Sequence, residues 1–168
     1  IPYDLFHGCT NLHIIYLDHN QIHELPPDLF HGCTNLRGIY LFHNQITELL
    51  SYLFQGCTNL QWLNLERNQI HELPPNLFHG CTNVQDISLN NNQFTELPPN
   101  LFHGVDHLRS LYLGNNPWEW IHKTTKDYLI KKNTEIFTID MDHPFDLDSI
   151  PVDDSPIVEY ELCKGQMN

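Results

Sequence analysis

A 24-residue sequence motif recurs five times within residues 1–116 and constrains the fold more than any other feature of the chain. Each copy carries an aliphatic residue, a second one three residues later, a leucine two residues after that, and an asparagine three residues further on. In the first copy these are Leu12, Ile15, Leu17 and Asn20. A fixed period of this length indicates stacked units that cannot bury their apolar face alone. The sequence therefore predicts a solenoid with one continuous core.

Each copy starts with the alternation of inward and outward residues that is typical of a half-buried strand. The segment that leads back to the next copy cannot form a long helix. Ile15 and Leu17 are predicted to point inward, while Ile14 and Tyr16 point outward. The asparagine lies where the chain turns, and its amide can bond the backbone of neighbouring turns. Three copies return through Leu-Pro-Pro, which lacks amide donors and favours extended backbone. An apolar row closes the back of the core, formed by Phe6, Phe30, Phe54, Phe78 and Phe102.

The skeleton, the turn asparagine and the back-face phenylalanine together resemble the leucine-rich repeat family, in the 24-residue form frequent in extracellular receptors. The resemblance covers residues 1–118. It implies an α/β solenoid, a leucine-rich repeat horseshoe with a parallel β-sheet on the concave side, an irregular convex side and a small C-terminal cap. It further implies that ligands bind the concave side, as in extracellular recognition by innate-immune or Toll-like receptor ectodomains.

We expect two parts, residues 1–116 as the repeats and residues 117–168 as a C-terminal cap with an acidic tail. Asn116-Pro117-Trp118 resembles the start of the family's cap, but the closely spaced cysteine pair of such caps is missing after it. We predict a helix at residues 122–132, with Lys131 and Lys132 at its C-terminal end, where the helix dipole is negative. Residues 136–139 predict a strand. Residues 140–161 contain eight acidic residues and no Lys or Arg.

The charge and hydropathy of the chain exclude two classes of partner. The net charge is −13, and binding to a phosphate backbone needs Lys and Arg. No stretch approaches the roughly 20 apolar residues of a membrane helix. We therefore expect no nucleic-acid partner and no membrane insertion in this segment. Because the chain starts at Ile1 in the middle of a repeat, we expect a processed form or an excerpt of a longer protein.

No sequence motif indicates catalysis or a cofactor. The chain lacks a Gly-x-Ser-x-Gly elbow, a phosphate-binding glycine loop and a His-Glu-x-x-His helix. The acidic pairs Asp140-x-Asp142 and Asp146-x-Asp148 lack the glycine and terminal glutamate of a calcium loop. No C-x-x-C spacing supports zinc. The sequence predicts a protein that is not an enzyme and holds no cofactor or metal.

The cysteines leave the compartment open. Cys9, Cys33, Cys57 and Cys81 occupy one position of successive copies, where Val105 stands in the fifth. This substitution favours reduced, buried thiols, since free cysteine behaves as a small hydrophobe. Disulfides between adjacent copies would need Cα atoms within about 7 Å and remain an alternative. Cys163 has no evident partner. The family resemblance favours an extracellular or secreted protein, and the unpaired cysteines favour a cytoplasmic one.

The outward strand residues differ from copy to copy and predict a protein-binding face. Adjacent strands lie about 4.8 Å apart, so large apolar side chains on the first three repeats would meet in one patch. Exposed aromatics beside arginine are typical of interface hot spots, whereas drift at solvent positions should yield Thr, Lys, Glu and Ser. The alternatives are an intracellular adaptor and a structural spacer. The predicted site for a protein ligand is Ile14, Tyr16, Tyr40, Phe42 and Trp62, flanked by Arg37 and Arg67.

A histidine recurs on the predicted back of four copies, at His7, His31, His79 and His103. Histidine titrates near neutral pH and binds metals, so a pH sensor or a metal site is one interpretation. A metal site also needs closing ligands and groups that orient them. We favour a solvated position that was copied by duplication.

Overall fold

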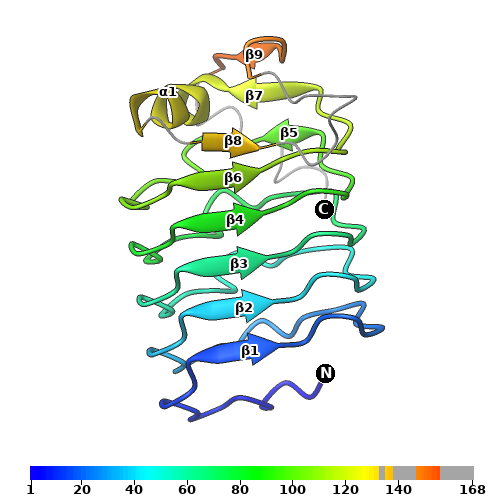
Figure 1. The fold of residues 1–168 in the computed structure, drawn as a ribbon, viewed down its shortest axis with the longest axis vertical. Helices are drawn as coiled ribbons and strands as arrows, with labels where there is room; N and C mark the ends of the chain where they lie inside the picture. Colours follow the sequence, from blue (N-terminus) through cyan, green and yellow to red (C-terminus); the bar gives the residue numbers. More distant parts are fainter. Residues whose placement is uncertain (133–134, 138–146, 156–168) are drawn as a thin grey trace.

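The computed structural model describes residues 1–132, 135–137 and 147–155, and it shows a solenoid in which the 24-residue units stack one above another (Figure 1). One parallel sheet runs along the stack in the order β1-β2-β3-β4-β6-β8. Its register places Ile15, Ile39 and Leu63 opposite one another, one repeat apart. The strands are β1 (Ile14–Tyr16), β2 (Gly38–Tyr40), β3 (Trp62–Asn64), β4 (Asp86–Ser88), β6 (Ser110–Tyr112) and β8 (Glu135–Phe137).

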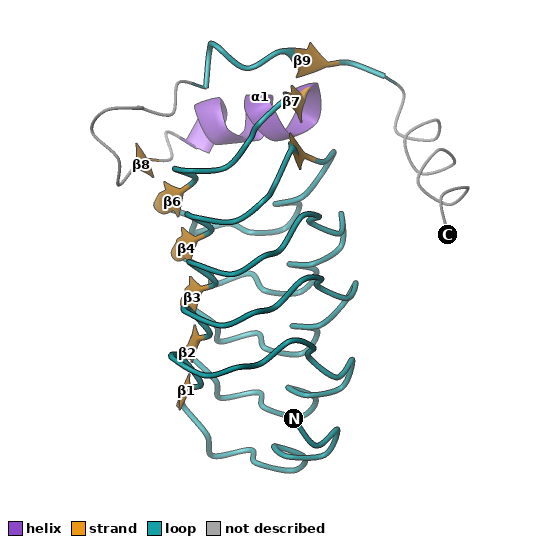
Figure 2. Ribbon diagram, turned by 90° about the vertical axis from the view of Figure 1, so that its right-hand side faces the viewer, coloured by secondary structure: helices purple, strands orange, loops and turns teal. Residues whose placement is uncertain are grey.

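The concave sheet and the irregular return segments occupy opposite sides of the stack (Figure 2). This is the predicted leucine-rich repeat architecture. The return segments contain turns rather than helices, as the Leu-Pro-Pro triplets require. The side chain of Phe30 lies in the interior between the two sides and is fully buried.

The C-terminal part continues the stack. A second parallel sheet has the order β5 (Glu96–Leu97), β7 (Trp120–His122), β9 (Val152–Asp153). Helix α1 (Lys123–Lys132) follows β7 and starts one residue later than predicted. The strand predicted at residues 136–139 is β8, and residues 138–139 lie outside the described residues. Lys126 donates to the Leu147 carbonyl at 3.0 Å and pairs with Asp148 at 3.1 Å, which holds α1 against the segment before β9.

A stack of phenylalanine rings runs along the back of the core, as predicted. Phe30, Phe54, Phe78 and Phe102 are at most 1% exposed. Successive ring centroids from Phe30 to Phe102 lie 5.7, 6.4 and 5.7 Å apart. Tyr128 of α1 extends the stack, 5.7 Å from Phe102, and its hydroxyl donates to the Val105 carbonyl. The helix therefore covers the end of the repeat core by continuing its pattern.

The turn asparagines form a second ladder. The Asn68 amide donates to the carbonyls of Leu41 and Leu65 at 3.0 Å each, and its Oδ1 accepts the Ile46 N–H at 3.1 Å. Asn44 and Asn92 make the equivalent bonds and are also buried. Each amide joins two consecutive repeats, which confirms the prediction from the turn position.

The thiols follow the prediction with one exception. Cys33, Cys57 and Cys81 are free and buried, and the Cys81 thiol donates to the Phe54 carbonyl of the preceding repeat at 3.4 Å. Burial is the main cause that raises the pKa of Cys57 and of Cys81 to about 12. The prediction was wrong for Cys9, which is exposed because its turn is the outermost of the stack. Cys163 lies outside the described residues.

Candidate partner-binding face

The predicted site residues all lie on the outer surface of the sheet or on the segments directly before and after its strands. Ile14 is 39% exposed and Tyr16 68% exposed, which places both among the exposed large hydrophobic residues of the chain. Tyr40, Phe42 and Trp62 are half-buried. Arg37 and Arg67 are exposed, one before β2 and the other after β3. The face therefore combines apolar side chains on the strands with cationic side chains beside them.

Tyr16 and Tyr40 form the centre of this surface. Their rings stack with centroids 5.0 Å apart and an interplanar angle of 13°. Burial is the largest cause that raises the pKa of Tyr40, followed by the neighbouring Tyr16 and Asp86. The register aligns the two tyrosines one repeat apart, so the stack is the direct result of having the same residue at the same position.

Gly38 makes room for this stack, a role that was not predicted from the sequence. In register, Gly38 lies between Ile14 and Trp62. A Cβ at Gly38 would come within 3.1 Å of Tyr40 Cε2 and 3.5 Å of the Ile14 side chain. The Tyr40 ring thus lies back over β2 into the space left by the glycine. The available signal in the sequence was a glycine between Ile14 and Trp62 at the same position of consecutive repeats.

The turns after the strands carry a second row of aligned side chains. These residues have left-handed backbone, with φ of 54° at His19, 55° at His43 and 53° at Arg67. The rings of His19 and His43 stack with centroids 4.6 Å apart and planes 15° apart. Arg67 Nη1 lies 2.8 Å from His43 Nε2, and its Nε lies 3.4 Å from Glu66 Oε1. These residues occupy one position of three consecutive repeats, and their stacking was not predicted from the sequence.

Phe42 joins the strand patch to this row of turn residues. Its ring meets His19 edge-on at 5.1 Å and an angle of 80°. It meets His43 at 6.1 Å and 69°. Two imidazoles therefore hold one of the predicted apolar site residues in place.

Asn90 lies in the fourth repeat at the position that Phe42 occupies in the second. Unlike Phe42, its side chain is fully buried. Its Oδ1 accepts the Gly114 N–H at 2.7 Å, and its Nδ2 donates to Ser88 Oγ at 3.4 Å. A short amide can turn back to satisfy the backbone of the next repeat, and Gly114 has no side chain in the way. The variable position is therefore a structural link in the fourth repeat.

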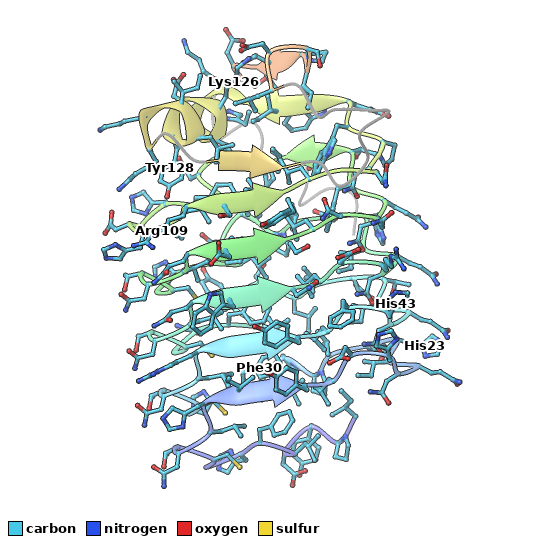
Figure 3. All side chains as sticks on the ribbon, viewed as in Figure 1. His23, Phe30, His43, Arg109, Lys126 and Tyr128 are labelled. Carbon is cyan, nitrogen blue, oxygen red and sulfur yellow. The ribbon has the colours of Figure 1, made fainter. Side chains whose placement is uncertain are left out.

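Charge is divided between the sheet face and the rest of the repeats. All three arginines of residues 1–116 lie beside the strands, and Figure 3 shows Arg109 at the start of a strand, on the side opposite His43. Only three of the ten acidic residues in this range belong to the same positions, namely Asp18, Glu66 and Asp86. Within the described residues, Arg37 and Arg109 make no ion pair. The face is thus close to neutral on a chain of net charge −13.

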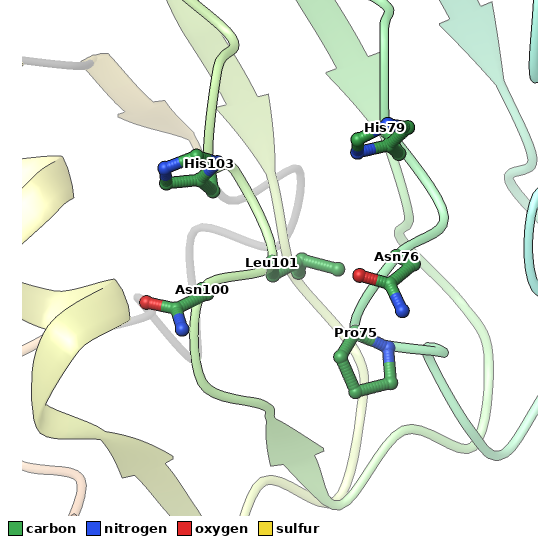
Figure 4. Close-up of a pocket in the computed structure, with 6 residues that line it drawn as sticks. All are labelled: Pro75, Asn76, His79, Asn100, Leu101 and His103. Carbon is green, nitrogen blue, oxygen red and sulfur yellow. The ribbon is translucent and has the colours of Figure 1, made fainter. Parts of the chain in front are cut away.

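The convex side carries the histidine row and a shallow polar hollow. His7, His31, His79 and His103 are all exposed there. A hollow of about 190 Å³ is lined by residues that include Asn76, His79 and His103 (Figure 4). The described residues contain no group of three or more His, Cys, Asp or Glu that could hold a metal ion. In the same part of the chain, no helix has the length and apolar character needed to cross a bilayer.

A parallel solenoid of 24-residue units, with a ladder of turn asparagines and a stack of phenylalanines, defines the leucine-rich repeat class. The leucine rich repeat family model matches residues 10–70 and 58–117. The chain belongs to the leucine-rich repeat family. Comparison with curated protein sequences finds no match.

Two solved structures illustrate the similarity. A chain in the structure of the Toll–Spatzle complex, described as a molecular hub in Drosophila development and innate immunity, is 30% identical with a TM-score of 0.64. The match covers 74% of this chain and 17% of that one. The APL1 leucine-rich repeat domain has a TM-score of 0.65 at 23% identity, covering 72% of this chain and 35% of the other, and supports the fold alone. The chain thus spans well under two thirds of either matched chain.

Proposed function

We propose that this chain is a non-enzymatic recognition module that binds a protein partner through its concave face. The stacked pair of Tyr16 and Tyr40 carries the proposal. Tyr16 is 68% exposed beside Ile14 at 39%, and its ring stacks on that of Tyr40. Contiguous exposed apolar surface on a folded protein marks an interaction site, and tyrosine and tryptophan are enriched among the residues that dominate binding energy.

Each site residue has a role in this proposal. Ile14, Tyr16, Tyr40, Phe42 and Trp62 would be covered by apolar groups of the partner. Arg37 and Arg67 would contact carboxylates or carbonyls at the rim, since a guanidinium presents five donors in a planar fork. The net charge of −13 disfavours nucleic acid as the ligand. The repeats at residues 1–116 would supply the binding face, and residues 117–168 would form the cap.

The proposed setting is extracellular or secreted, in innate-immune recognition. It is supported by the 30% identity to a chain of the Toll–Spatzle complex. The second candidate is an intracellular adaptor that uses the same face. The four described cysteines favour it, because all are free and disulfides are rare in reducing compartments. Immunolocalisation of the native protein separates the two settings.

Site-specific photo-crosslinking tests the binding face itself. Two exposed tyrosines provide a matched pair, Tyr16 on the sheet and Tyr52 (45% exposed) among the convex turns. Each is replaced in turn by benzoylphenylalanine, and the chain is irradiated in extracellular fluid and in cell extract of its source. The proposal predicts a discrete protein adduct from position 16 and none from position 52. Adducts from position 52 alone, or from neither position, would contradict it.

A further inference from the structure

A row of side chains with hydrogen-bond donors runs along the edge of the concave sheet at which its strands begin. Its members occupy the position directly before each strand, and none of them is acidic. The backbone aligns them, since from Arg37 onward each N–H donates to the carbonyl of the same position one repeat earlier, at 2.7–2.9 Å. This row, which we call the donor row, consists of His13, Arg37, Gln61, Gln85 and Arg109.

The two arginines of the donor row carry positive charge without an ion-pair partner. Arg37 and Arg109 are both exposed, and neither forms an ion pair with any residue that the structure describes. Figure 3 shows Arg109 at this edge of the sheet. On a chain of net charge −13, two unpaired arginines in one row create a local site for negative charge.

The spacing of these arginines fits an extended peptide. Arg37 precedes β2 and Arg109 precedes β6, which is three strand steps along the sheet, or about 14 Å at about 4.8 Å per step. An extended chain rises about 3.4 Å per residue, so side chains about four residues apart span the same distance. Residues i and i+4 of such a chain also point to the same face. A segment that runs along the stack can therefore bring one carboxylate to each arginine.

The middle of the donor row suits a peptide backbone better than a third negative charge. Gln61 and Gln85 lie between the two arginines, and each amide can donate to a backbone carbonyl and accept from a backbone N–H. Trp62 follows Gln61 and offers apolar surface beside the row. Asp86 follows Gln85 and would repel an acidic side chain at this place. Positive charge at two ends with a carboxylate between them disfavours a uniform polyanion.

We propose that the partner of the concave face presents an extended acidic segment, with two carboxylates four residues apart, that lies along the donor row. One carboxylate pairs with Arg37 and the other with Arg109, each by two parallel hydrogen bonds to the planar guanidinium. The residue midway between them is not acidic and faces the two glutamines. This inference rests on the proposed binding function and adds the chemical class of the partner.

Two isomeric peptides test the spacing on the free chain. Acetyl-Glu-Ser-Val-Ser-Glu-amide has its carboxylates four residues apart, and acetyl-Ser-Glu-Val-Glu-Ser-amide has them two apart. Each is titrated to about 5 mM, where weak binding is still measurable, while NMR follows the arginine Nε–H signals of residues 1–168. The first peptide should shift Arg37 and Arg109 together and bind about three- to fivefold more tightly, the gain from a second exposed ion pair. Arg67, which pairs with Glu66, is the internal reference and should not shift.

Matched charge variants assign the preference to the donor row. Arg37→Gln/Arg109→Gln should bind both isomers equally. The control, Lys123→Gln/Lys131→Gln, removes the same charge from exposed positions of α1 and should keep the preference. Equal binding of the isomers by the wild type, arginine signals that do not respond, or a preference that survives in the arginine variant would overturn the proposal.

A further arm of the experiment distinguishes another class of anion. A heparin-derived hexasaccharide that shifts the same two arginine signals at lower concentration than the first peptide would assign the row to sulfated glycans and overturn the proposal. A protein adduct at position 16 together with equal binding of the isomers would overturn the acidic segment and leave the proposed function intact. A clear preference for the first isomer without an adduct at position 16 would support the acidic segment and contradict the proposed function.

Discussion

The rings of Tyr16 and Tyr40 lie parallel at a centroid distance of 5.0 Å, close to the spacing of the strands that carry them. Repetition of one residue type at one position of consecutive repeats therefore produces a stack. The same repetition stacks the His19 ring on the His43 ring, with centroids 4.6 Å apart, and the Phe30 ring on the Phe54 ring, with centroids 5.7 Å apart. In this fold, side chains that recur at one position of consecutive repeats form a continuous row. A different residue at that position in one repeat ends the row.

The space at Gly38 can be filled without damaging the fold. In Gly38→Ala the new Cβ would lie 3.1 Å from Tyr40 Cε2, which is the far end of a movable side chain. We expect the free energy of unfolding to change by less than about 1 kcal/mol, because the Tyr40 ring can move aside and no backbone atom lies among the nearest neighbours of the new methyl group. Tyr40 moves instead, and the NOEs between the Tyr16 and Tyr40 rings weaken. Ser110→Ala, in the same column of β6, serves as the control. Unaltered NOEs in Gly38→Ala would show that the glycine does not position the ring.

The asparagine ladder should contribute strongly to stability. Asn68→Ala leaves two carbonyls and one N–H of neighbouring turns without their side-chain partner. We expect a loss of about 2–4 kcal/mol, because each buried backbone group left unsatisfied costs about 1–3 kcal/mol. The control is Asn20→Ala, since Asn20 is exposed and its amide donates to the Leu17 and Asp18 carbonyls of its own turn. Urea unfolding measures both variants, and equal losses would contradict a role in joining repeats.

The buried thiols predict the behaviour of the chain at alkaline pH. Burial is the main cause that raises the pKa of Cys57 and Cys81 from 9.0 to about 12, and that of Tyr128 from 10.0 to about 12. The folded chain thus keeps protons that the unfolded chain has lost, so stability falls as pH rises from about 9 to 12. The urea midpoint should be lower at pH 10.5 than at pH 8.0. The double variant Cys57→Ala/Cys81→Ala should show a smaller decrease, and an equal decrease would assign the effect to other groups.

The sequence predicted the repeat architecture because the five copies act as an internal alignment. Positions that keep one residue type, such as Asn68 and Phe54, are those that contact a neighbouring repeat. Their burial and contacts follow from the period alone. The helix was predicted to within one residue because its apolar positions continue the core, where Thr125 and Leu129 are buried.

The finer features of the face depend on contacts between copies that differ. Asn90 is buried because Gly114 of the next repeat leaves its N–H free to receive the amide. Cys9 is exposed because nothing in the described chain packs beyond its turn. Gly38 is decisive only because a tyrosine follows two residues later. Each of these features depends on which residue lies next to it in space. The residues found at one repeat position do not give that information.

The central claim is that the concave face binds a protein, and dissociation constants measure it most directly. The partner is the protein crosslinked at position 16. Two double variants are compared with the wild type after thermal unfolding shows that both are folded, namely Tyr40→Ala/Trp62→Ala on the sheet and Leu50→Ala/Tyr52→Ala among the convex turns. Leu50 and Tyr52 are 39% and 45% exposed and so match the apolar character of the patch.

We expect the sheet variant to bind at least about 30-fold more weakly, which corresponds to about 2 kcal/mol and to one hot spot. The convex variant should stay within about twofold of the wild type, as expected for residues outside an interface. A sheet variant that binds like the wild type, or a convex variant that loses the partner, would contradict the assignment of the concave face.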